Sequence, residues 1–171
     1  MSTSGQEVQK VDMSASAQSA VENPNSQSVE KAASSTMMSD EDYDTLLHIV
    51  EAEAGGEDIK GRVMVANVIM NRVKSDQFPD TVTEVVWDTE GGYLFSPTYD
   101  GRIETVEISP ETREAVKMAL EGTDYSQGAL FFVAKDQASK ENVAWFEKDL
   151  KELFEHGVHT FYTYPDEETV S

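Results

Sequence analysis

Hydrophobic side chains first recur at a regular spacing after residue 38. From there to residue 54 they follow one another three or four positions apart, the period of a helix with one buried face. They are Tyr43, Leu46, Leu47, Val50 and Ala54. Ser39 stands as an N-cap before three acidic residues, and the glycine pair Gly55 and Gly56 ends the pattern. The sequence therefore predicts a helix that begins after Ser39 and ends at the glycine pair.

Further helices follow from the same reasoning. A core helix is expected over residues 57–74, because apolar residues cover most of its faces. These are Ile59, Val63, Val65, Ala66, Ile69, Met70 and Val73. A short helix with Asp80 or Thr81 as its cap comes next, and another helix runs from its N-cap Ser109 to Gly122.

Two runs have the composition of strands, residues 129–134 ("ALFFVA") and 157–164 ("GVHTFYTY"). Between them we expect one more helix, from the spacing of Val143, Phe146, Leu150, Leu153 and Phe154. Residues 90–103 ("EGGYLFSPTYDGRI") are too irregular for a regular element, and such an aromatic loop either lines a binding site or packs as an ordinary loop. The predicted fold class is α+β, a mainly helical domain with a small antiparallel sheet.

The chain divides by composition into three parts. Residues 1–38 contain no Leu, no Ile and no aromatic residue, so they bury too little apolar surface to offset the entropy of ordering. We predict a disordered linker there, with a frayed helix docked through its valines as the alternative. Residues 39–165 are expected to form one domain, and residues 166–171 an acidic tail.

The net charge and the absence of cysteine exclude several classes of partner and of site. With 33 Asp and Glu against 13 Lys and Arg, the net charge of −20 repels phosphate backbones and anionic lipid, so we expect neither nucleic acid nor a membrane as partner. The absence of cysteine excludes disulfides and thiolate metal sites. His48 and Glu51 could place two ligands on one helix face, but a zinc peptidase motif is missing. We therefore expect no metal and no cofactor.

Three glutamates lie at the end of the first predicted helix, in "LLHIVEAEAGGE". At about 100° per residue, Glu53 follows the apolar Ile49 and Val50 by one turn and lies at the edge of the core. Glu51 has a mixed, polar flank and is interpreted as solvated. Glu57 is placed in the first turn of the next helix, where negative charge is favourable.

Desolvation at the edge of the core would raise the pKa of Glu53 and keep it protonated near neutral pH, as a general acid requires. The alternative is a helix-end carboxylate that reaches solvent or pairs with Arg62 or Arg72.

Four stretches in order resemble the cell-wall hydrolases related to the spore-cortex-lytic enzyme of germinating spores. They are "EAEAGGEDIKGRVMVANVIMNRVKSDQFPDTVTEVVWD", "LFSPTYDGRI", "GALFFVAK" and "HGVHTFY", within residues 41–163. The resemblance implies a lysozyme-like domain that cuts peptidoglycan between N-acetylmuramic acid, or its lactam form, and N-acetylglucosamine. It also implies that Glu53 is the catalytic acid of a reaction similar to that of lytic transglycosylases.

The implied sugar groove would use the rings of Tyr93, Phe95 and Tyr99 and the hydroxyl of Ser96. His159 matches the family's terminal histidine, and either contacts substrate or orients the structure near the site. A hydrolase would need a second carboxylate, for which Glu57, Glu90 and Asp100 all stay open.

The resemblance further implies a monomer that acts on peptidoglycan outside the cytoplasm, with any signal or anchor lying outside this sequence. Two other interpretations compete with a muralytic enzyme. One is a glycan-binding or regulatory domain of the same fold that has lost activity. The other is a structural protein whose acidic surface binds a basic partner.

Overall fold

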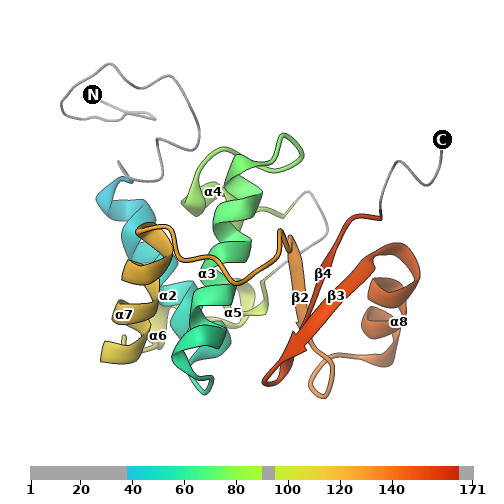
Figure 1. The fold of residues 1–171 in the computed structure, drawn as a ribbon. Coiled ribbons are helices and arrows are strands. Elements are labelled where there is room, and N and C mark those ends of the chain that lie inside the picture. Colours follow the sequence, from blue (N-terminus) through green and yellow to red (C-terminus); the bar gives the residue numbers. More distant parts are fainter. Residues whose placement is uncertain (1–37, 90–94, 166–171) are drawn as a thin grey trace. The chain divides into compact units, whose positions relative to one another are not determined.

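The computed structural model describes residues 38–89 and 95–165 (Figure 1). The predicted linker, apart from Met38, and the acidic tail lie outside the described residues, as does Tyr93. Contacts divide the chain after Asp44, so the part from Thr45 onward is described by itself. Helix α2, Asp40–Ala54, begins before that division, and its N-cap is the predicted Ser39, whose hydroxyl accepts a hydrogen bond from the Asp42 amide at 3.0 Å.

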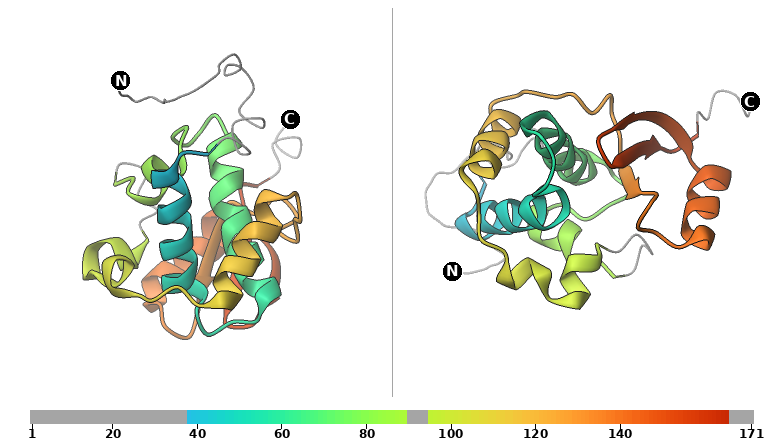
Figure 2. Two further views of the ribbon diagram at one scale, coloured as in Figure 1. Left: turned by 90° about the vertical axis from the view of Figure 1, so that its left-hand side faces the viewer. Right: turned by 90° about the horizontal axis from the view of Figure 1, so that it is seen from below.

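The core of the part from Thr45 onward is helix α3, Ile59–Lys74. Every residue from Gly61 to Met70 is buried, which confirms the prediction of a core helix. Asp58 caps the helix by accepting a hydrogen bond from the Gly61 amide at 2.8 Å. Figures 1 and 2 show α3 between helix α7, Pro110–Leu120, and the sheet, and α3 packs directly against both.

Two more predicted caps are confirmed. Helix α4, Val82–Val86, begins after Thr81, whose hydroxyl accepts from the Glu84 amide at 3.1 Å. Helix α7 begins after Ser109, whose hydroxyl accepts from the Thr112 amide at 3.2 Å. A side chain that satisfies a free amide of the first turn is a local interaction, which is why sequence alone locates these helix starts.

The stretch predicted to be irregular contains two short helices instead. Helix α5, Ser96–Asp100, has Pro97 in its first turn, and helix α6, Arg102–Thr105, follows at once. Gly101 joins them with φ +89°, a conformation that a residue with a Cβ rarely adopts. Helices of one turn are too short to show a hydrophobic period, so the prediction failed here.

A three-stranded antiparallel sheet completes the domain, with the order β2-β4-β3. Its strands are β2, Phe131–Ala134, β3, Lys151–His156, and β4, His159–Thr163. Phe161 of β4 lies opposite Phe132 on one side and Phe154 on the other, and its ring stacks on that of Phe154 at 4.9 Å. These contacts confirm the predicted sheet and show that it has three strands where the sequence indicated two.

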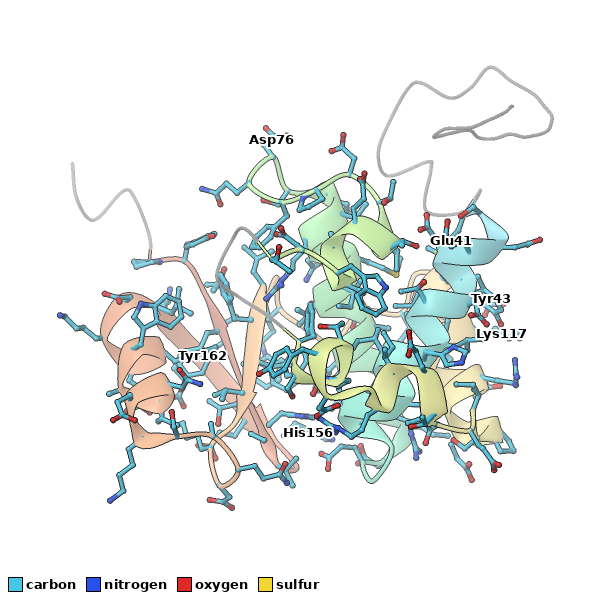
Figure 3. All side chains as sticks on the ribbon, turned by 180° about the vertical axis from the view of Figure 1, so that it is seen from behind. Glu41, Tyr43, Asp76, Lys117, His156 and Tyr162 are labelled. Atoms are coloured by element: carbon cyan, nitrogen blue, oxygen red, sulfur yellow. The ribbon has the colours of Figure 1, made fainter. Side chains whose placement is uncertain are left out.

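The last predicted helix is too long at its C-terminal end. Helix α8, Lys140–Asp149, ends before Leu150, and Leu153 and Phe154 belong to strand β3. Their spacing also fits a helix, but pairing with β4 buries Phe154 against the core cluster and decides the conformation. Figure 3 shows Tyr162 on the side of the sheet toward α8, where the ring of Phe146 lies 5.2 Å from its ring.

None of the helices in the described part of the chain is both long and apolar enough to cross a membrane.

Candidate active site

Glu53 lies on the last turn of α2, on the turn that follows the fully buried Ile49 and Val50. Its side chain is only partly exposed. Burial raises the pKa of Glu53 to about 7; nearby Arg102 and Arg72 act to lower it, and Asp100 acts to raise it. The direction of this shift agrees with the sequence analysis, and it leaves a carboxyl group that can both hold and release a proton near neutral pH.

The ion pair of Glu53 with Arg62 or Arg72, which the sequence left open as an alternative, is not formed. Among the described residues, no hydrogen bond or ion pair joins Glu53 to Arg62 or Arg72. Arg62 instead donates to the carbonyl oxygen of Gly55, in the turn after α2. The carboxyl group of Glu53 is therefore not neutralised by a direct salt bridge to either arginine.

Arg102 is hydrogen-bonded to the backbone of Ala52, the residue directly before Glu53. Its guanidinium donates to the carbonyl oxygen of Ala52 at 3.3 Å, to the carboxylate of Asp100 at 3.0 Å and to the hydroxyl of Ser96 at 3.1 Å. The backbone amide of Arg102 also donates to Asp100, at 3.0 Å. Helices α5 and α6 thus bring one cation and one anion to the end of α2, next to the candidate acid.

Arg72 approaches the site from the core helix. Its guanidinium carbon lies 4.8 Å from the ring centres of Phe78 and Phe95 and 5.2 Å from that of Phe131, and its Nε donates to the carbonyl oxygen of Leu130 at 2.8 Å. Aromatic faces attract a cation electrostatically, so these rings stabilise a buried positive charge. Arg72 thereby adds a fixed positive charge on the core side of Glu53.

The predicted sugar-contacting residues lie in different environments. Phe95 is 5% exposed, with its ring 6.0 Å from that of Phe132, so most of its surface is used in packing. Ser96 is half-buried and accepts the hydrogen bond from Arg102. Tyr99 is 70% exposed and offers the most open ring of these residues.

His159 packs against Phe132, the residue whose ring also lies next to that of Phe95. It is 3% exposed, and its ring lies 5.0 Å from that of Phe132. Burial lowers the pKa of His159, with Glu57 acting to raise it and His156 to lower it, which favours the neutral ring. Its Nδ1 atom is buried and has no hydrogen-bond partner among the described residues. Phe95, Phe132 and His159 thus form a wall that connects the sheet to helix α5.

The sequence indicated that Glu51 is solvated, and this prediction is wrong. Its carboxylate accepts hydrogen bonds from the amide and the hydroxyl of Ser109, both at 3.0 Å, and from the hydroxyl of Thr112 at 2.6 Å. Burial by itself would raise the pKa of Glu51, but these hydrogen bonds and the charge of Arg62 lower it overall. Within the described residues, no three His, Asp or Glu side chains are placed to hold a metal ion.

Glu57 is also placed differently from the prediction, because α3 begins two residues later, at Ile59. Its carboxylate accepts a hydrogen bond from the Val158 amide at 3.1 Å. Next to it, Asp58 pairs with His156 at 2.8 Å, near the foot of the sheet in Figure 3. The two acids hold the turn between β3 and β4.

The geometry therefore brings together Glu53, Ser96, Asp100 and Arg102, with Phe95 linking them to His159. Sequence reasoning missed the part of Arg102. The signal present in the sequence was an acidic and a basic residue on either side of Gly101, a glycine that lets the two helices meet at a sharp turn.

Comparison with known proteins agrees with this picture. Residues 56–162 match the model of a family described as Cell Wall Hydrolase, and the match begins three residues after Glu53. The spore cortex-lytic enzyme of Oceanobacillus iheyensis is 36% identical over 118 residues, which cover 69% of this chain and 41% of that protein. The spore cortex-lytic enzyme of Bacillus subtilis is 33% identical over 118 residues, covering 69% and 37%. The chain thus spans about two fifths of the length of these relatives.

Two solved structures are similar. The catalytic domain of the germination-specific lytic transglycosylase SleB from Bacillus anthracis is 28% identical, with a TM-score of 0.63, and the match covers 82% of this chain and all of that domain. The catalytic domain of the Bacillus cereus SleB protein is 30% identical, with a TM-score of 0.61, and the match covers 74% of this chain and 92% of that one. The prediction of a mainly helical, lysozyme-like α+β domain is thereby confirmed.

Proposed function

The chain belongs to the cell wall hydrolase family, and from this premise we propose that it cleaves the glycan strands of peptidoglycan through Glu53. The observation that carries the proposal is a partly buried carboxyl group with a pKa of about 7, at the end of a helix and without a salt bridge to Arg62 or Arg72. A general acid works best when its pKa is near the working pH. We assign the activity to residues 39–165.

The proposed reaction needs one carboxyl group of the protein. Protonated Glu53 gives its proton to the glycosidic oxygen between N-acetylmuramic acid and N-acetylglucosamine as the bond from that oxygen to C1 breaks. The resulting carboxylate takes the proton of the muramoyl 6-hydroxyl, whose oxygen forms a new bond to C1. The products are a free N-acetylglucosamine end and a 1,6-anhydro-muramoyl end, and Glu53 is protonated again.

This route suits the surroundings of Glu53. A carboxyl group shielded from water keeps its proton until the leaving oxygen needs it. Asp100 is engaged by Arg102, and Glu57 by the turn after β3, so neither is a free second carboxylate in this structure. Glu90 lies outside the described residues. We therefore favour a lytic transglycosylase over a two-carboxylate hydrolase, in line with the description of the Bacillus anthracis neighbour.

Substrate contacts are proposed at Tyr99, whose exposed ring offers a face to a sugar, and at Ser96, through its hydroxyl. The buried Phe95 and His159 would support the wall of the groove. Tyr93 was predicted for the same groove and lies outside the described residues.

The relatives named spore cortex-lytic enzymes extend the proposed substrate to cortex peptidoglycan, in which muramic lactam replaces part of the muramic acid. Peptidoglycan lies outside the cytoplasm, so we propose that the protein acts there, as a monomer. Cortex and vegetative wall are the two substrates to compare.

The test is the digestion of purified vegetative peptidoglycan and of lactam-containing cortex, with products resolved by mass spectrometry. The parent protein is compared with Glu53→Gln and with Glu114→Gln, which removes the same charge from the exposed surface of α7. We expect anhydro-muramoyl ends from the parent and from Glu114→Gln, and none from Glu53→Gln. A folded parent that releases no fragments from either substrate would overturn the enzymatic function and favour a glycan-binding domain.

A further inference from the structure

Charged groups from three elements act electrostatically on Glu53. Arg72 of α3 and Arg102 of α6 are positive, and Asp100 of α5 is negative. Arg72 is buried under aromatic rings and donates to the carbonyl oxygen of Leu130, directly before β2, so its position is set by the core. Arg102 and Asp100 are different, because their side chains are 48% and 41% exposed and contribute little to the core.

The hydrogen bonds of Arg102 nevertheless fix it in one place. Nη1 bonds to the carbonyl oxygen of Ala52, the residue directly before Glu53, so the guanidinium is tied to the backbone that carries the candidate acid. Nε and Nη2 are held by Asp100 and Ser96. A planar guanidinium held by three acceptors has little freedom to turn away.

Such an arrangement matters most after the proton has left. While Glu53 is protonated it carries no charge, and Arg102 gains little from being near it. Once the proton is on the leaving oxygen, Glu53 is an anion in a partly buried position, and a nearby fixed cation lowers the free energy of that anion. Asp100 is an anion beside the same position and has the opposite effect, besides holding the cation in place.

We propose that Arg102 is a positioning residue for Glu53, seated by Ala52, Ser96 and Asp100 so that its charge stabilises the carboxylate left after proton transfer, and that Asp100 limits this stabilisation. The role of the carboxylate in a reaction rests on the proposed function, but the electrostatic arrangement itself does not. The pair therefore sets the pH range in which Glu53 holds its proton.

The first experiment observes Glu53 directly. The full chain is labelled with ¹³C at glutamate carboxyl groups, the Glu53 signal is assigned by its loss in Glu53→Gln, and its titration midpoint is measured by NMR. Arg102→Gln is expected to raise the midpoint by roughly half a pH unit, since both charges of the pair are half exposed and partly screened. Asp100→Asn is expected to lower it. Arg102→Lys keeps the charge and should stay close to the parent.

Two controls change the same charges elsewhere. Lys117→Gln on α7 and Asp76→Asn on the loop after α3 remove one cation and one anion from exposed positions that Figure 3 labels. Both should leave the midpoint of Glu53 unchanged. The inference is overturned if Arg102→Gln moves the midpoint no further than Lys117→Gln, or if Arg102→Lys moves it as far as Arg102→Gln, because the charge would then not be the cause.

The pH profile of cleavage supplies the second readout. The pH at which the cleavage rate decreases on the alkaline side should be higher in Arg102→Gln and lower in Asp100→Asn, in parallel with the NMR midpoints. A parent that shows the expected midpoints but no cleavage would overturn the proposed function and leave the arrangement of charges intact. A cleaving parent whose Glu53 midpoint is the same in every variant would overturn only the present inference.

Discussion

At the residue scale, the same burial that prepares Glu53 for acid chemistry opposes folding. In the unfolded chain its pKa returns to the ordinary value of 4.5, whereas in the folded protein it is about 7. Between these two values the folded protein holds a proton that the unfolded chain has released. The free energy of unfolding therefore falls as the pH rises from 4.5 to 7, and stays lower above that range.

The first prediction concerns this loss. Glu53→Gln removes the ionisable group, so the variant should be more stable than the parent above pH 7, by up to roughly 3.5 kcal/mol for a shift of this size. Well below pH 4.5 the two proteins should have similar stability. Urea unfolding at several pH values measures the difference. Equal stability of parent and variant at alkaline pH would contradict the burial of Glu53.

The second prediction is the pH dependence of cleavage. Because the protonated form of Glu53 is the proposed acid, the rate should decrease above pH 7, by about tenfold per pH unit where the acid limits the rate. Release of glycan fragments from peptidoglycan over a pH series measures this decrease. A rate that stays constant far into the alkaline range would assign the acid to a different group.

At the scale of elements, Glu51 connects the end of α2 to the beginning of α7. Its carboxylate satisfies the Ser109 amide and two hydroxyls at the start of α7, where a negative charge is also favourable. The helix that carries Glu53 is thus held at its end by a second helix. The pKa of Glu51 in the folded protein is lower than its ordinary value of 4.5. The stabilisation that this carboxylate gives is therefore present above pH 4.5 and is lost as the pH falls through the lowered pKa.

The third prediction tests this connection. Glu51→Ala should destabilise the domain by about 1 to 3 kcal/mol, because it leaves the donors of Ser109 and Thr112 without a partner. Thr112→Val should cost less, and the double variant should cost less than the sum, since the two residues share one interaction. Thermal unfolding of the three variants measures the coupling. Additive losses would mean that the side chains act independently.

Another connection lies at the turn between β3 and β4. Gly157 has φ +60°, and a Cβ at this position would lie 1.8 Å from the Glu57 carboxylate oxygen. A residue other than glycine would be strained by the backbone conformation here and would displace the Glu57 carboxylate.

The fourth prediction follows from that fit. Gly157→Ala should destabilise the domain by about 1 to 3 kcal/mol, through strain at a positive φ and displacement of Glu57. Gly128→Ala is the control, since Gly128 also has a positive φ, +81°, but has open space around it. Urea unfolding compares the two. A loss clearly smaller than that of Gly128→Ala would show that the contact with Glu57 contributes nothing.

Sequence predicted the elements whose signals are local. The helix starts at Ser39, Thr81 and Ser109 follow from caps that act over three residues, and the apolar setting of Glu53 follows from helical period. The partners of Glu51 lie 58 or more residues away, and that of Glu57 lies 101 residues away. The spacing of apolar residues along one helix gives no information about contacts this far apart in sequence. Glu51 was therefore placed in solvent, and Glu57 in the first turn of the next helix.

The misplacement of Leu153 and Phe154 has a related cause. Their spacing from Leu150 fits a helix, and only the pairing with β4 selects a strand. Arg102 was missed because it begins one single-turn helix, and its partners Ser96 and Asp100 lie on another; helices this short leave no periodic signal. In the first case pairing across the tight turn between β3 and β4 outweighed the helical spacing, and in the second the elements were too short to show a period.

At the scale of the whole molecule, the net charge of −20 opposes contact with an anionic substrate. Peptidoglycan and its attached polymers are largely anionic, so association should be weakened at low ionic strength. Salt at physiological concentration shortens the reach of surface charges to about 8 Å.

The fifth prediction is that binding to purified cell walls increases as salt is raised from about 10 mM to about 150 mM, in contrast to the loss of binding shown by a basic wall-binding protein. Co-sedimentation of Glu53→Gln with walls measures binding without digestion. A decrease of binding with salt would reveal a basic contact surface that the overall charge conceals.

The pairing of Glu57 with Val158 also sets an order of events during synthesis. The helix that carries the proposed acid is made before the sheet, and the turn after this helix gains one of its partners only when residue 158 has been added. A ribosome-bound or truncated chain that stops before that residue lacks this closure and the β4 strand with His159. The proposed cleaving ability would therefore arise only after the segment through β4 has been added to the chain.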